Sequence, residues 1–128
     1  MSLKYLRNKI KLLKLPNGLT WIHINDHKLK DTSSGNFRVE VGSYDEIREN
    51  VENGVAHLLE HSLFLKNTNQ EKSLFINWNA NTASQATNYL FSTSNKNFKA
   101  GFEVYWNNLI NFEPLEKIRD ELSNVDSE

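Results

Sequence analysis

The chain has 128 residues, of which 38% are hydrophobic and 24% are charged, proportions typical of a single globular domain in water. It contains no cysteine, which excludes disulfide bonds, thiol catalysis and cysteine-ligated metal centres. Fifteen basic and sixteen acidic side chains leave a formal charge of −1. The chain as a whole therefore has no field that would attract nucleic acid or an anionic membrane, and we expect neither as a partner.

Residues 1–14 form a basic segment without acidic side chains, which has two interpretations. An acid-free, partly apolar start is found in transit peptides, but Pro16-Asn17-Gly18 follows at once and is typical of a turn that leads into a strand. We therefore favour a solvated segment. Apolar runs are far shorter than the roughly 18 residues that a membrane span needs, so we expect a cytoplasmic chain.

The first half of the chain predicts two strands. Leu19 to Ile24 alternates and is rich in β-forming residues, and a polar loop from Asp26 to Gly35 follows it. Phe37, Val39 and Val41 then alternate with polar residues, which indicates a second strand with one buried face. A charged connection from Tyr44 to Asn53 leads to a segment whose apolar residues are so dense that we expect a largely buried helix, from Val55 to Leu65.

The second half predicts two more strands and two helices. The strands are expected at Leu74–Thr82 and Asn88–Thr93, and a long amphipathic helix between about Asn95 and Asn111. Pro114 suits the first turn of a last helix. The fold class is therefore α+β, a mixed or antiparallel sheet with helices packed on one face, and residues 1–128 are expected to form one domain.

One pattern carries chemistry, namely His57-Leu58-Leu59-Glu60-His61. On a helix that turns 100° per residue the two histidines and Glu60 share one side. Two imidazoles one turn apart are a standard way to offer two nitrogens to Zn²⁺, and a carboxylate beside them can take a proton from water. The pattern is short, and the alternative is a helix with two histidines by chance.

The longer context resembles the inverted-motif zinc metallopeptidases, the family of insulin-degrading enzyme, pitrilysin and the mitochondrial processing peptidase. The segments that carry the resemblance are Leu15-Pro16-Asn17-Gly18-Leu19, Val41-Gly42-Ser43 with Asp45-Glu46, Gly54-Val55-Ala56 before the motif, Leu63-Phe64 after it, Asn79-Ala80-Asn81-Thr82, Thr87-Asn88-Tyr89 and Pro114-Leu115. The resemblance implies one Zn²⁺ per chain, with His57 and His61 as ligands and Glu60 as general base. It also implies a substrate strand that adds at Asn79, Ala80 and Asn81.

The family takes its third zinc ligand from a glutamate on a later helix and has a second glutamate seven residues earlier. Glu121 and Glu128 have this spacing and would share a helix face. By themselves two acids at a chain end indicate a solvated face. After the motif, we assign Glu128 as the third ligand and Glu121 as a carboxylate that orients a ligand or the water.

His23 and His27 are not assigned to a metal, because residues four apart on a strand and its exit are about 13 Å distant. The resemblance covers about the N-terminal half of one family domain, so further homologous domains or a partner subunit are expected. The predicted function is a zinc-dependent peptidase acting on polypeptides. The alternative is a non-catalytic zinc-containing binding or regulatory module derived from the same fold.

Overall fold

The computed structural model describes residues 7, 9–26, 28, 30–63 and 67–111 of the chain. They belong to two compact units, one ending at Lys30 and the other beginning at Asp31. The prediction that residues 1–128 form one domain stays a prediction. In the part of the chain that the structure describes, no helix has both the length and the apolar character needed to cross a membrane.

The first unit contains an antiparallel hairpin of β1 (Ile10–Lys14) and β2 (Thr20–Ile24). The predicted turn joins the two strands, closed by the Gly18 N–H, which donates to the Leu15 carbonyl at 2.9 Å. Strand β2 confirms the prediction, whereas β1 was not predicted. One face of the hairpin carries exposed aliphatic side chains from both strands, Ile10, Leu12, Ile22 and Ile24.

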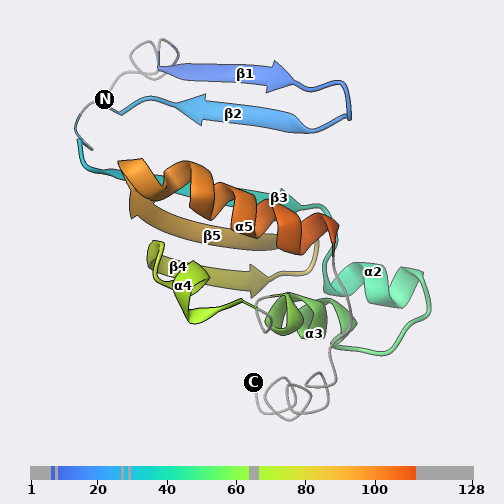
Figure 1. Cartoon of the computed structure of the whole chain (residues 1–128). Helices are drawn as coiled ribbons and strands as arrows, with labels where there is room; N and C mark the ends of the chain where they lie inside the picture. Colours follow the sequence, from blue (N-terminus) through green and yellow to red (C-terminus); the bar gives the residue numbers. More distant parts are fainter. Residues whose placement is uncertain (1–6, 8, 27, 29, 64–66, 112–128) are drawn as a thin grey trace. The chain divides into compact units, whose positions relative to one another are not determined.

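The second unit is a three-stranded antiparallel sheet with helices (Figure 1). The strand order is β3-β5-β4, so the latest strand in the chain lies between the other two. The elements in chain order are β3 (Thr32–Val39), α2 (Ser43–Arg48), α3 (Val55–Ser62), α4 (Asn69–Lys72), β4 (Phe75–Thr82), β5 (Thr87–Ser94), the short 3₁₀ turn η1 (Asn95–Asn97) and α5 (Phe98–Ile110).

Alternation along the central strand β5 places the core on one face of this sheet. Thr87, Tyr89, Phe91 and Thr93 are buried, whereas the residues between them are partly or fully exposed. Helix α5 packs against this face and adds Tyr105, which is fully buried. The aromatic rings contact one another at centroid distances such as 4.6 Å for Phe91–Tyr105 and 5.0 Å for Phe37–Phe102. Burial of these aromatic side chains stabilises the unit.

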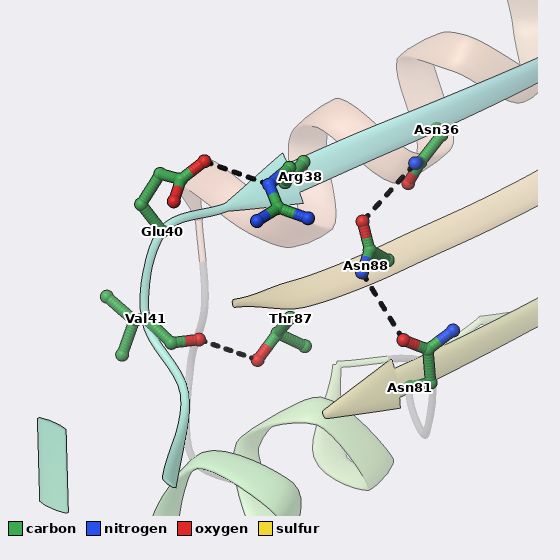
Figure 2. A network of polar contacts seen from close by, with 7 residues as sticks. All are labelled: Asn36, Arg38, Glu40, Val41, Asn81, Thr87 and Asn88. Carbon is green, nitrogen blue, oxygen red and sulfur yellow. Dashed lines mark hydrogen bonds and ion pairs between the residues drawn. The ribbon is translucent and has the colours of Figure 1, made fainter. Parts of the chain in front are cut away.

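The opposite face of the sheet is polar. A ladder of amides crosses all three strands: the Asn36 Nδ2 donates to Asn88, and the Asn88 Nδ2 donates to Asn81, both at 3.3 Å (Figure 2). Beside it, Arg38 pairs with Glu40 at 2.9 Å. The sheet therefore has one apolar and one hydrogen-bonding face, as a half-covered antiparallel sheet should.

The α+β fold class is confirmed, and each predicted strand and the predicted long helix corresponds to an observed element. Three details differ. The charged connection contains helix α2, and β3 begins at Thr32 inside the predicted loop and ends at Val39. Helix α3 is not largely buried, because Val55 and Leu59 are 45% and 39% exposed. The helix predicted from Pro114 lies outside the described residues.

Candidate metal centre

Helix α3, which carries the His57–His61 motif, is held at its start by a buried carboxylate. Gly54, the residue before the helix, has a φ of 90°, a left-handed conformation that favours glycine. Glu46 of α2 is only 5% exposed. Its Oε2 accepts from the Gly54 N–H at 2.9 Å, and its Oε1 accepts from the Ala56 N–H at 2.8 Å. A negative charge at this end also complements the helix dipole.

Helix α2, which carries Glu46, is itself fixed to the loop between β4 and β5. The Ser43 N–H donates to the Ala83 carbonyl at 3.1 Å and the Tyr44 N–H to the Ser84 carbonyl at 2.8 Å. A Cβ at Gly42 would lie 2.2 Å from the Ala83 carbonyl oxygen, so only glycine permits this approach. Backbone hydrogen bonds therefore connect the sheet to α2, and Glu46 connects α2 to α3.

The two histidines of the motif face each other from successive turns of α3. Both are half-buried, and their Nε2 atoms are 3.0 Å apart. Two ring nitrogens at this separation need a proton or a cation between their lone pairs. Two nitrogens bound to one tetrahedral zinc ion at 2.0–2.1 Å would be about 3.3 Å apart, so a small adjustment brings His57 and His61 to ligand geometry.

Glu60 lies between the histidines in sequence but points into the unit. It is 7% exposed, and its Oε2 accepts a hydrogen bond from the Thr82 hydroxyl at the end of β4. The charge of Glu60 also affects the Tyr89 side chain of β5. Burial raises the pKa of the Tyr89 hydroxyl above its usual range, and the negative charge of Glu60 raises that pKa further.

The two histidines offer ligand nitrogens to one metal ion, and the Glu60 carboxylate lies beside them. One ligand atom from each of His57, Glu60 and His61 lies within 4.8 Å of the other two. Two imidazole nitrogens one helical turn apart are donors that zinc binds well, and a neighbouring carboxylate that does not bind the metal can act as a base. The residues therefore fit a zinc ion, with the histidines on the more accessible side and the carboxylate held inside.

The family model for "Insulinase (Peptidase family M16)" matches residues 22–127 of the chain. The chain belongs to this family. The chain is also 33% identical over 133 residues to a protein named "Insulin-degrading enzyme homolog" from Dictyostelium discoideum. That alignment covers 94% of the chain and 13% of the relative, so the chain spans a small part of the relative's length.

In this M16 chain the residues predicted to receive substrate lie on β4, an edge strand of the three-stranded sheet. The Asn79 amide oxygen accepts from the Ala80 N–H at 2.9 Å. Asn81 belongs to the amide ladder on the polar face (Figure 2). The structure thus places Asn79, Ala80 and Asn81 on the strand whose end contacts Glu60, and their role in substrate binding stays a prediction.

The remaining assignments of the sequence analysis fall mostly outside the described residues. Glu121 and Glu128 lie there, so their assignments to the metal site stay predictions. His23 is on β2 in the first unit, and His27 is also outside the described residues.

Sequence reasoning did not find the contacts of Glu46 with the start of α3 or of Thr82 with Glu60. Both lie in segments that carried the family resemblance, but neither residue was assigned a contact or a role there. Glu46 gave no local signal, because it lies on another helix, eight residues before Gly54 in sequence. Thr82 offered none, because its partner Glu60 is 22 residues away in sequence.

Proposed function

We propose that the chain is the zinc-binding part of an M16 peptidase that hydrolyses peptide bonds. The observation that carries the proposal is the juxtaposition of His57 and His61, whose Nε2 atoms are 3.0 Å apart, with the buried carboxylate of Glu60. Membership of the family supports the same chemistry. We assign His57, His61 and Glu128 as the ligands of one Zn²⁺, with Glu121 behind them as an orienting carboxylate.

Zinc bound in this site supplies a Lewis acid, which makes water acidic enough to act as a nucleophile near neutral pH. Glu60 does the proton transfer. Its Oε2 is engaged by the Thr82 hydroxyl, so we assign the transfer to Oε1, which takes the proton from water and returns it to the leaving amine. The two histidines hold the metal.

The substrate is proposed to be an extended polypeptide that adds to the edge of β4 at Asn79–Asn81. Main-chain hydrogen bonds along an edge strand bind peptides with loose sequence selectivity. The Asn79 amide oxygen already accepts the Ala80 N–H, so a peptide that pairs with this N–H must displace that side chain. Further homologous domains or a partner subunit are proposed to enclose the bound peptide.

The proposal is tested by mixing the chain with Zn²⁺ and an internally quenched unstructured peptide. We expect cleavage that stops with a chelator and resumes when zinc is restored. Glu60→Gln should retain zinc and lose at least about 100-fold in kcat, because an amide cannot accept the proton. Glu52→Gln, at an exposed acid between α2 and α3, is the matched control and should cleave normally.

Two results would contradict this function. Cleavage by Glu60→Gln within a few-fold of the unaltered chain would remove Glu60 as the base. Peptide binding without any cleavage would favour the non-catalytic zinc-containing module.

The third ligand is tested separately by zinc titration. Glu128→Ala should weaken zinc binding greatly, whereas Glu121→Ala should weaken it about 10- to 100-fold, as for a group that only orients a ligand. A larger effect of Glu121→Ala would exchange the two roles.

A further inference from the structure

Thr82 is the last residue of β4, and its hydroxyl donates to Oε2 of Glu60 on α3. Thr82 is half-buried, and Glu60 is 7% exposed. This hydrogen bond joins the site helix directly to the sheet. It is a side-chain contact between two elements that are 22 residues apart in sequence, so no local backbone geometry enforces it.

A buried carboxylate without partners is costly, and a hydrogen bond from a hydroxyl to an ionised oxygen is among the stronger ones in proteins. The same bond restricts the torsions of the glutamate, which has three rotatable bonds. Threonine is suited to holding the glutamate carboxylate because its own β-branched side chain has a restricted χ1. The donor is therefore rigid, and it is placed by the strand.

We propose that Thr82 is a positioning residue, which holds Oε2 of Glu60 so that Oε1 is presented for proton transfer. Because β4 carries both Thr82 and the edge at Asn79–Asn81, the same strand would fix the carboxylate relative to the bound peptide. The inference rests on the proposed peptidase function for its catalytic consequence. The contact itself is independent of that function.

The chain offers a closely matched control in Thr87, which pairs directly with Thr82 across the two strands. The Thr87 hydroxyl donates to the Val41 carbonyl at 2.9 Å and not to Glu60 (Figure 2). Thr87→Val and Thr82→Val thus remove the same hydroxyl group from neighbouring positions in the sheet. Only the second removes a partner of the proposed base.

The contact is tested on the metal-free full chain by a double-mutant cycle of Thr82→Val with Glu60→Ala, measured by urea unfolding. We expect the two changes to be coupled by about 10-fold or more in the unfolding equilibrium constant, as for a hydrogen bond to a charged group. Thr87→Val with Glu60→Ala should be additive. If Glu60→Ala does not fold, Glu60→Gln replaces it and a smaller coupling of the same sign is expected.

The catalytic consequence is tested with zinc and the quenched peptide. Thr82→Val should lower kcat about 10- to 100-fold, leave KM and the zinc affinity within about twofold, and be largely rescued in Thr82→Ser, which retains the hydroxyl. Thr87→Val should destabilise the chain but leave kcat unchanged. A merely structural threonine would not produce this split.

Additivity in the Thr82 cycle, or an unchanged kcat in Thr82→Val, would overturn the inference. An equal loss of kcat in Thr82→Val and Thr87→Val would also overturn it. If the unaltered chain cleaves nothing, the proposed function fails, and the cycle still decides whether Thr82 holds Glu60.

Discussion

Helices α5 and α3 are held in the same unit by different forces. Helix α5 has 13 residues and packs on the sheet through aromatic side chains, with Tyr105 fully buried. Helix α3 has 8 residues and exposes Val55 and Leu59. It is held by polar contacts, among them the two hydrogen bonds to Glu46 and the one from Thr82.

Because of this difference, the stability of the unit and the geometry of the site depend on different interactions. Burial of apolar surface is strong and non-directional, so α5 can supply folding free energy without precise geometry. Charged hydrogen bonds are directional and individually modest. Loss of one of them should therefore displace the proposed metal site while the sheet and α5 remain folded.

The largest effect is expected from the aromatic core. Phe91 is 2% exposed and contacts Phe75, Phe98 and Tyr105. Phe91→Ala should lower the free energy of unfolding by about 3–5 kcal/mol, because it removes apolar contacts and leaves a cavity. Urea unfolding measures it. A loss below about 1 kcal/mol would show that the core does not rest on this ring.

The next effect concerns the metal and not the fold. His57→Ala and His61→Ala should each weaken zinc binding by about 10²–10³-fold, since each removes one ligand of the site. The metal-free variants should unfold within about 1 kcal/mol of the unaltered chain, because both side chains are only half-buried. Competition with a chromophoric chelator measures the affinity. Undiminished zinc in either variant would place the site elsewhere.

A smaller effect is expected from a change at Glu46, which should lower both the free energy of unfolding and the zinc affinity. Glu46→Gln keeps one acceptor oxygen but loses the charge and the second acceptor, and we expect a destabilisation of about 1–3 kcal/mol. Zinc affinity should fall as well, because α3 loses its fixed start. Glu52→Gln is the control. Equal unfolding and equal zinc affinity in the two variants would contradict a role of Glu46 in holding α3.

The smallest effect is a pH dependence of the free energy of unfolding, which is caused by Tyr105 of α5. Burial raises the pKa of the Tyr105 hydroxyl above its ordinary value of 10.0. Above pH 10 the unfolded chain releases this proton while the folded chain retains it, so stability should fall by up to about 1.4 kcal/mol per pH unit. Urea unfolding at several pH values measures the slope, and Tyr105→Phe should make it shallower. An unchanged slope in that variant would exclude this tyrosine as a source.

The sequence by itself determined the elements whose signal is local. Alternation over Leu19–Ile24 and over Phe37, Val39 and Val41, and the periodic aromatics of α5, depend on which face each residue presents, and this follows from backbone geometry alone. The motif likewise brought His57 and His61 together, because residues four apart on a helix are neighbours. Family membership was also readable from the sequence.

Only the tertiary structure decided what lies around the motif. The order β3-β5-β4, the hydrogen bonds from α2 to the β4–β5 loop, and the contacts of Glu46 and Thr82 join residues that are distant in sequence. No periodicity encodes such pairs, because they depend on how elements pack and on which buried polar group finds which partner. The proximity of Glu60 to the two histidines was therefore predictable, but the group that contacts its carboxylate was not.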